Sequence, residues 1–481
     1  MQWLILDIGT TSIKGGVFDY DGQLLEQASS TGTQGSSGSP TPEGWWRACG
    51  EIIRELTPAR TDSLAGIALT GQMQNLILLN ASGELIRPVI SYGDQRGSEV
   101  LSAWEGDPQV KDLLVETGNE QGPTSVLAKL CWMQAHEPEH LVSARQIFLG
   151  SADYVAFRLT GARVTDTTTA TTTGLMNLQT RAWHEPLLRV LGLEQLLSAL
   201  PRLVQGGAEV GKLSSQVATD WGLPQELPVY LGPGDAGATT LGSGCSKPGR
   251  AYAYCGTSGW VGFTETAPAA PESGVFTLAH PEAGHFIQVA PILTAGGGLS
   301  WVKQVFEVQD YEALITEAMG APKGELIYLP YLQGERSPFI DPHARGAWIG
   351  LSLQTEAAHL KRAVLEGCCL AFRHALQAVT QSPISELYLT GGTTRSPKFC
   401  QLFSDVIGLP VRVLSNSELT GLLGVLVSVA PESAASEPEV EQTFSPDPKS
   451  HEHYTGLFQI YLKAYPALKP VFSELVQTPF S

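Results

Sequence analysis

The chain has 481 residues, 43% of them hydrophobic, and its 30 basic and 48 acidic side chains give a net charge of −18. This length exceeds the ~250–300 residues at which one core stops growing, so two domains are expected, and the acidic balance argues against nonspecific binding to nucleic acid or anionic membranes. The seven cysteines include no CxxC pair, which favours a reducing cytoplasm over a disulfide framework or a zinc site. No stretch approaches the ~20 apolar residues of a membrane span, and no basic segment precedes the first apolar run, so we expect neither a membrane protein nor a targeting peptide.

The first 19 residues predict a strand, a polar turn and a second strand. An apolar run too short for a helix breaks at Gly9, and a β-rich segment then continues to Asp19. Turns of this composition present N–H groups and hydroxyls that can surround an anion, and a carboxylate at the strand end can hold Mg²⁺ through water. The residues concerned are Asp7, Thr10, Thr11, Ser12 and Lys14. The alternative is an ordinary Gly/Thr hairpin with a surface lysine.

Polar residues follow two further predicted strands. Helical spacing of apolar residues predicts a helix from Pro42, and the run 64–69 predicts a strand. Met73 and Gln74 come just after this strand, at a sheet edge where α/β proteins collect ligands. Asp94 and Arg96 follow a predicted strand over 88–92 in the same way. The alternative for Gln74 is a solvated turn residue.

Residues 104–200 are predicted to be mostly helical, with one threonine-rich interruption. The run 165–173 contains seven threonines and is followed by Gly174. We interpret it as a polar loop facing either a cleft or solvent.

Two glycine motifs each fit a nucleotide site incompletely. Residues 206–213 match a phosphate-binding P-loop except at Leu213, where a serine or threonine must reach Mg²⁺. Residues 232–237 satisfy GxGxxG after a predicted strand, but a dinucleotide site needs an acid ~20 residues later. The next acid after Asp235 is Glu265, which weakens a dehydrogenase interpretation.

Asp235 remains as a candidate for chemistry, because it begins a predicted helix between glycines. One interpretation is a helix N-cap, a position that aspartate fills well. The other is a general base held over a cleft and kept ionised by the helix N-terminus.

The opening pattern returns about 250 residues later. Residues 251–263 again predict a strand, a Gly-Thr-Ser turn and a strand. Two such hairpins predict a duplicated α/β unit with a nucleotide between the halves, and this architecture resembles the superfamily of actin, hexokinase and chaperone ATPases, with two ribonuclease H-like domains. We expect the boundaries 1–243 and 244–481, with a cleft between the domains. Toward the C-terminus, a glycine turn is predicted after strand 387–390, followed by a helix from Ser396 to Gly408.

With these motifs in view, the sequence is identified as resembling the FGGY family of carbohydrate kinases over nearly its whole length. The resemblance rests on the residues 7–12, 256–258, 330–351 and 391–396, together with Asp235. It implies ATP-dependent phosphorylation of a sugar hydroxyl, with Asp235 as the catalytic aspartate and Mg²⁺ near Asp7. The implied nucleotide-binding residues are Thr10, Thr11, Ser12, Lys14, Gly256, Thr257, Gly296, Gly392 and Ser396.

Within the family, residues 71–73 are most similar to xylulokinases, which implies a ketopentose such as xylulose as acceptor. The implied substrate-binding residues are Met73, Gln74, Asp94, Arg96 and Asp235. The xylulokinase motif continues with His-Gly where this chain has Gln74 and Asn75, so D-ribulose, another ketose, a polyol or a sugar acid stay open, as does a non-catalytic ATP-binding member. The resemblance alone implies a homodimer. Residues 431–450 are predicted to form a mobile surface loop before a terminal helix.

Overall fold

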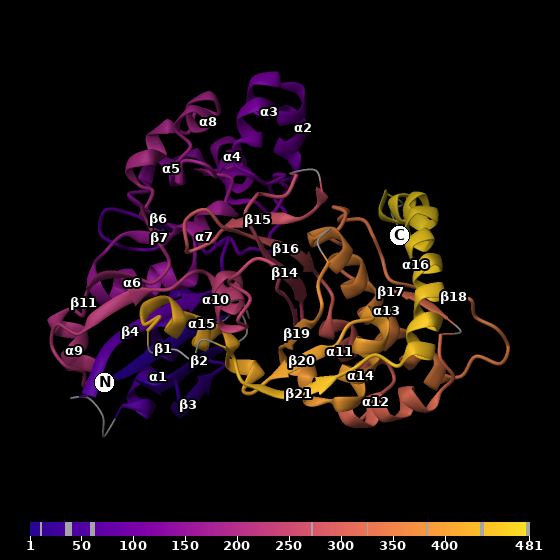
Figure 1. Ribbon diagram of the computed structural model, residues 1–481. Coiled ribbons are helices and arrows are strands. Elements are labelled where there is room, and N and C mark those ends of the chain that lie inside the picture. Colours follow the sequence, from indigo (N-terminus) through magenta and orange to yellow (C-terminus); the bar gives the residue numbers. More distant parts are fainter. Residues whose placement is uncertain are drawn as a thin grey trace.

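The computed structural model describes residues 1–9, 12–33, 41–57, 63–270, 273–324, 326–380, 383–432 and 437–477. Thr10 and Thr11 lie outside the described residues. Figure 1 shows two halves side by side, each built on its own central sheet with helices against it. In the part of the chain that is described, no helix combines the length and hydropathy needed to cross a bilayer.

The first half is built on a six-stranded mixed sheet of order β11-β12-β4-β1-β2-β3. Strand β1 pairs antiparallel with β2 and parallel with β4, so the predicted opening hairpin is confirmed. The strands are β1 (Gln2–Ile8), β2 (Ile13–Asp19), β3 (Leu24–Ser30), β4 (Leu64–Gly71), β11 (Ala208–Lys212) and β12 (Pro228–Leu231).

The helices of the first half cover this sheet and form a separate apolar cluster away from it. The predicted helix from Pro42 is confirmed, with Thr41 as its N-cap. The helices are α1 (Pro42–Leu56), α2 (Ser98–Gly106), α3 (Pro108–Val115), α4 (Val126–His136), α5 (Pro138–Ser143), α6 (Ser151–Thr160), α7 (Thr167–Thr171), α8 (Glu185–Val190), α9 (Ser215–Trp221) and α10 (Asp235–Gly242). Short strand pairs link them: β5 (Ile77–Leu79) with β6 (Gln146–Phe148), β7 (Val164–Asp166) with β10 (Arg202–Val204), and β8 (Met176–Asn177) with β9 (Ala182–Trp183).

The second half is built on a seven-stranded sheet of order β15-β16-β14-β13-β19-β20-β21. Its strands are β13 (Ala251–Cys255), β14 (Gly259–Glu265), β15 (Phe276–Ala279), β16 (Phe286–Ile292), β19 (Leu387–Thr390), β20 (Val411–Leu414) and β21 (Val440–Phe444), with a separate pair of β17 (Ile327–Leu329) and β18 (Ala347–Ile349). Its helices are α11 (Gly296–Val305), α12 (Tyr311–Gly320), α13 (Ala357–Val379), α14 (Pro397–Ile407), α15 (Thr420–Val429) and α16 (Pro448–Gln477).

The two sheets repeat one pairing pattern. In each half an antiparallel hairpin, β1–β2 or β13–β14, lies beside two parallel strands, β4 and β12 or β19 and β20. A helix then follows the last parallel strand, α10 in the first half and α15 in the second. This repeat confirms the predicted duplication of an α/β unit.

Helices α10 and α15 cross between the sheets with their backbones in close contact. A Cβ atom added at Gly424 would lie 1.7 Å from the carbonyl oxygen of Ala238, and one at Gly242 would lie 1.9 Å from that of Thr420. Side chains of α15, among them Leu422 and Leu426, pack against one face of β1 in the other half. The two halves therefore share a helix pair at their junction.

Several predictions from the sequence were wrong. The run 165–173 is not a polar loop but a buried strand end and the short helix α7, because its hydroxyls find partners inside the protein. Residues 440–444 form β21 in place of the predicted loop, since they complete the edge of the sheet beside β20. Only an isolated bridge at Ile90 occurs where a strand was predicted over 88–92. By contrast, the incomplete P-loop match at 206–213 was not expected to bind phosphate, and it is largely strand β11.

Candidate active site

Asp7 faces the junction of the two halves because of the period of β1. Successive side chains of a strand point to opposite faces. Leu4 and Leu6 enter the core beneath α1, whereas Trp3 and Ile5 pack toward α15, so Asp7 continues the second row. Its Oδ2 lies near Gly421, at the start of α15, and its buried Oδ1 has no hydrogen-bond partner among the described residues. Burial raises the pKa of Asp7, and Lys14 opposes that rise.

A cavity of about 760 Å³ opens between the halves at this point. The first hairpin contributes Asp7, Gly9, Ser12 and Lys14, and the second hairpin contributes its turn. The further lining residues relevant here are Asp235, Tyr254, Thr257, Ser258, Gly297, Thr390, Ser417 and Thr420. Both predicted hairpins and Asp235 therefore border the same space.

Lys14 bridges the halves across this cavity. Its ammonium group donates a hydrogen bond of 2.7 Å to the carbonyl oxygen of Glu418, which lies in the short 3-10 helix η5 (Ser417–Leu419) just before α15. An ammonium group has three donors, so hydrogen-bonding capacity is left for an anion in the cavity.

Asp235 is the first residue of α10, where the chain leaves β12 through a glycine-proline turn. Its Oδ1 accepts a hydrogen bond of 2.8 Å from the N–H of Ala236. Burial raises its pKa to about 7, and the neighbouring carboxylates Asp7 and Asp166 add to this rise. The sequence predicts that the helix N-terminus keeps Asp235 ionised, but desolvation and like charge outweigh the helix dipole. A pKa near neutrality suits a general base.

We therefore expect kcat/KM of the free enzyme to fall as pH drops below about 7, since a protonated Asp235 cannot accept a proton. The charged groups that act on Asp235 come from two elements, Asp7 on β1 and Asp166 on β7, and Asp235 in turn raises the pKa of Tyr252 and Tyr254 on β13. A pH profile of initial rates would measure this decline below about pH 7, here called the acidic limb.

Two further buried side chains beside the smaller cavity have pKa values shifted into the same range, and one of them provides the control. Burial brings the pKa of Lys129 to about 7 and that of Glu335 to about 8. The acidic limb should stay near pH 7 in Glu335→Gln, because this carboxyl does not act on Asp235. A limb that disappears in that variant would contradict its assignment to Asp235.

The remaining predicted nucleotide residues lie around the second hairpin, at varying distance from the cavity. Gly296 and Gly297 begin α11 and donate to the carbonyl oxygens of Gly256 and Thr257 at 2.8 Å. A Cβ at Gly296 would lie 2.5 Å from the Gly256 oxygen, so this contact requires glycine. Thr257 and Gly297 line the cavity, whereas Gly256 and Gly296 support them from behind.

Residues 391–396, one of the ranges that carry the family resemblance, form a turn after β19. Gly391 has a positive φ of 100° and approaches the carbonyl of Cys255, and Gly392 begins the 3-10 helix η4 (Gly392–Arg395) with open space at its Cβ position. The hydroxyl of Ser396 accepts from the N–H of Phe399 as the N-cap of α14. Thr390, just before this turn, lines the cavity, while Gly392 and Ser396 do not.

A smaller cavity of about 210 Å³ adjoins the first. The two cavities share Tyr92, Ser258, Leu293 and Gln333 among their lining residues. Gln74 lines the smaller cavity with a positive φ of 61°, and its amide donates to the carbonyl of Thr172 at 2.9 Å. Among the described residues, the hydrogen bond of the Gln74 side chain involves its amide nitrogen and leaves its side-chain carbonyl available to the cavity.

The other predicted acceptor residues lie near this cavity but do not line it. Met73 packs against Gly234, directly before Asp235. Asp94 and Arg96 pair with each other through two hydrogen bonds of 2.8 Å, and the Arg96 guanidinium lies over the ring of Trp132. This pair therefore shapes the wall from behind.

The sequence interpretation missed several polar residues of the smaller cavity: Gln95, Gln121, Thr172, Gln333, Glu335 and Arg336. Gln333, Glu335 and Arg336 belong to the motif 330–351, but no predicted strand end indicated where in the fold they would lie. Gln95 stood between the two residues that were chosen. Thr172 belongs to the run that was interpreted as a loop.

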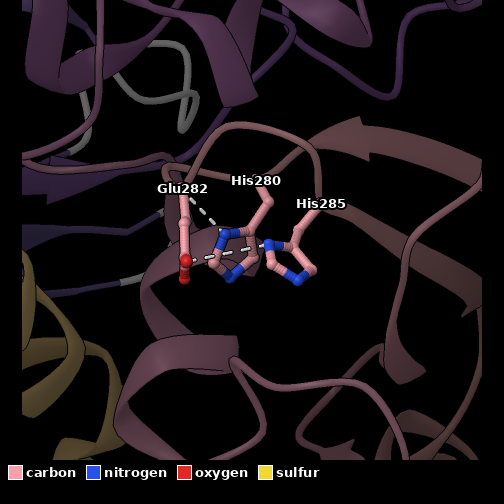
Figure 2. A group of neighbouring side chains, drawn as sticks. All are labelled: His280, Glu282 and His285. Atoms are coloured by element: carbon pink, nitrogen blue, oxygen red, sulfur yellow. Dashed lines mark hydrogen bonds and ion pairs between the residues drawn. The ribbon is translucent and has the colours of Figure 1, made fainter.

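His280, Glu282 and His285 form a compact group at the tip of the β15–β16 hairpin (Figure 2). The cysteine pattern gave no signal for it. Nδ1 of His280 accepts a hydrogen bond of 2.9 Å from the N–H of Glu282, so in the neutral ring Nε2 carries the proton and is not a free ligand. Arg181 donates to the carbonyl oxygens of both histidines, and its positive charge disfavours a cation there. The group is best explained as a hairpin tip held against the first half.

Two halves that share one strand-pairing pattern, with a cavity bordered by both hairpins, define a two-domain α/β fold of the actin and hexokinase type. Residues 2–242 match the N-terminal domain of the FGGY family of carbohydrate kinases, and residues 251–430 match the C-terminal domain. The chain belongs to the FGGY family of carbohydrate kinases.

Individual relatives are similar over almost the whole chain. A xylulose kinase from Klebsiella pneumoniae is 30% identical over 492 residues, covering 98% of this chain and 100% of that protein. A gluconate kinase from Lactobacillus acidophilus superimposes with a TM-score of 0.90 at 25% identity, covering 98% of this chain and 99% of that one. A ligand-bound xylulose kinase from Lactobacillus acidophilus superimposes with a TM-score of 0.89 at 26% identity, covering 98% and 100%.

Proposed function

We propose that this carbohydrate kinase transfers the terminal phosphoryl group of ATP to a hydroxyl of a ketopentose, with xylulose as the acceptor. The observation that carries the proposal is the position of Asp235, a carboxyl with a pKa of about 7 that borders the same cavity as both hairpins. The whole-chain similarity to xylulose kinases supports the choice of acceptor.

The larger cavity suits the nucleotide and the smaller one the acceptor. Backbone N–H groups and hydroxyls of the two turns would hold the phosphates together with Lys14. The proposed phosphate-binding residues include Thr10 and Thr11, which lie outside the described residues. Phosphoryl transfer depends mainly on positioning and charge neutralisation. Asp235 would accept the proton of the attacking hydroxyl, while Gln74 and the polar wall of the smaller cavity would orient the sugar.

Asp7 fits a magnesium site. Within the part of the chain that the structure describes, its buried Oδ1 lacks a partner, and carboxylate oxygen is a ligand that Mg²⁺ accepts, usually together with water and substrate phosphates. The ion, when bound with ATP, would neutralise charge on the phosphate oxygens. A bound Mg²⁺ would also offset the free-energy cost of burying the Asp7 carboxylate.

We also propose the domain boundaries 1–243 and 244–481, with the acceptor mainly on the first domain and the nucleotide on the second. Each half has its own large apolar cluster around its own sheet, which supports this division. Seven free, buried cysteines support a reducing cytoplasm as the location, and the net charge of −18 supports small-molecule partners over nucleic acid.

The acceptor is tested by an ATP-dependent screen of ketoses, polyols and sugar acids, with ADP release as the measurement. We expect the highest kcat/KM with a ketopentose, in line with the whole-chain similarity to xylulose kinases. Turnover of gluconate in preference to xylulose would contradict the choice of acceptor and leave the kinase assignment intact.

A further inference from the structure

The threonine-rich run holds the turn that carries Asp235. Asp166 is only 1% exposed, and its Oδ1 accepts hydrogen bonds from the N–H of Thr169 at 3.0 Å and from that of Gly234 at 3.3 Å. Gly234 directly precedes Asp235, so one buried carboxylate connects the start of α7 to the start of α10.

The same turn has little room to move. A Cβ at Gly234 would lie 2.3 Å from the sulfur of Met73 and 2.6 Å from the hydroxyl of Thr169. On the strand side, the hydroxyl of Thr70 donates a hydrogen bond of 2.7 Å to the carbonyl oxygen of Pro233. Polar and apolar contacts thus fix the turn on several sides, and among the contacts named here Asp166 supplies the one made by a carboxylate.

Helix α7 is in turn attached to the other half of the molecule. The hydroxyl of Thr168 donates to the carbonyl oxygen of Ala279 at 2.8 Å, and the N–H of Ala279 donates to the hydroxyl of Thr171 at 3.0 Å. Ala279 is the last residue of β15, an edge strand of the second sheet. Threonine side chains therefore satisfy both backbone groups of an edge residue that has no further strand beside it.

We propose that Asp166, Thr168 and Thr171, here called the threonine junction, form a positioning element that uses the second half of the molecule to orient the Asp235 turn. Asp166 is the positioning residue, and the two threonines anchor it to β15. The inference rests on the proposed function, since it assigns Asp235 as the base. The threonine junction itself contacts no reacting atom.

Substitutions at Asp166 separate charge from geometry. Asparagine keeps an oxygen that can accept from Gly234 but removes a negative charge that raises the pKa of Asp235, whereas alanine removes both. The other carboxylate that acts on Asp235, Asp7, remains in place, and so do Tyr252 and Tyr254, whose pKa values Asp235 raises. In Asp166→Asn the acidic limb should therefore move to lower pH, so that the ratio of kcat/KM at about pH 6 to that at about pH 8 rises above the wild-type ratio.

Asp166→Ala and Thr168→Val should lower kcat by about tenfold or more with little change in KM for ATP, because a small misplacement of a reacting group can cost ~10²-fold. Thr173→Val is the matched control. Thr173 is equally buried, but its hydroxyl donates to Ala170 and accepts from Leu175 within its own segment. It should keep the wild-type kcat and pH profile.

All variants would be made in the full chain and compared by thermal unfolding and by the pH dependence of ketopentose phosphorylation. An Asp166→Asn limb that stays at the wild-type pH, or a Thr168→Val kcat equal to that of Thr173→Val, would overturn the inference. Absence of sugar-dependent ADP release in the wild type would instead overturn the proposed function, so the two failures are distinguishable.

Discussion

Asp235→Asn is expected to reduce kcat by at least ~10²–10⁴-fold, the factor that a positioned base supplies. The amide has the shape of the carboxylate but cannot accept the hydroxyl proton at any useful rate. Its oxygen can still accept from Ala236, so α10 should begin as before. ATP binding should persist, because the phosphate-facing groups are on the two hairpins. Steady-state kinetics and calorimetric titration with ATP would measure the two effects separately.

Asp220→Asn is the matched control for this change. Asp220 lies at the end of α9, where it accepts a hydrogen bond from Gln216 on the protein surface. The same chemical substitution there should leave kcat unchanged. An Asp235→Asn enzyme retaining a tenth or more of wild-type kcat would contradict the role of Asp235.

Gly424→Ala is expected to cause the largest loss of stability among simple substitutions at the junction of the halves. The added methyl group would lie 1.7 Å from the carbonyl oxygen of Ala238, so α15 must move away from α10. Overpacking of this kind costs roughly 1–3 kcal/mol and at times more, which exceeds the ~1 kcal/mol that alanine gains over glycine inside a helix. Because α15 also borders the larger cavity, kinase activity should fall as well. Thermal unfolding monitored by circular dichroism would measure the first effect.

Gly456→Ala provides the opposite expectation. Gly456 is also helical, in α16, but apart from its own helix backbone no atom of the described residues lies within 4 Å of the position its Cβ would take. There the substitution should raise the unfolding temperature slightly, through helix propensity alone. Equal shifts in both variants would contradict the close contact between α10 and α15.

The sequence predicted the parts of the fold that depend on local patterns. Both hairpins were visible because apolar runs stop at Gly9 and at Gly256, and the helix from Ser396 to Gly408 because its cap, its proline and its final glycine are local signals. The duplication and the family could be inferred from the order of these motifs along the chain.

What the sequence did not predict depends on contacts between distant segments. The run 165–173 looks solvated because threonine is polar, yet its hydroxyls pair with β15, more than 100 residues away. The pKa of Asp235 depends on carboxylates at positions 7 and 166, which no local pattern brings together. For the candidate site, Asp235 and the first hairpin were foreseeable, but the wall formed by Gln95, Thr172 and Arg336 was not.

The two halves repeat one backbone, but they do not repeat its acids. Asp7 is the penultimate residue of β1 and Asp235 the first of α10, whereas the corresponding places in the second half hold Tyr254 and Thr420, both beside the larger cavity. A pseudosymmetric backbone would by itself allow equivalent functional groups on both sides of the cavity. Because Asp7 and Asp235 both belong to the first half, the proposed magnesium ligand and the proposed base lie on one side of the larger cavity, and a pseudosymmetric backbone carries an asymmetric site.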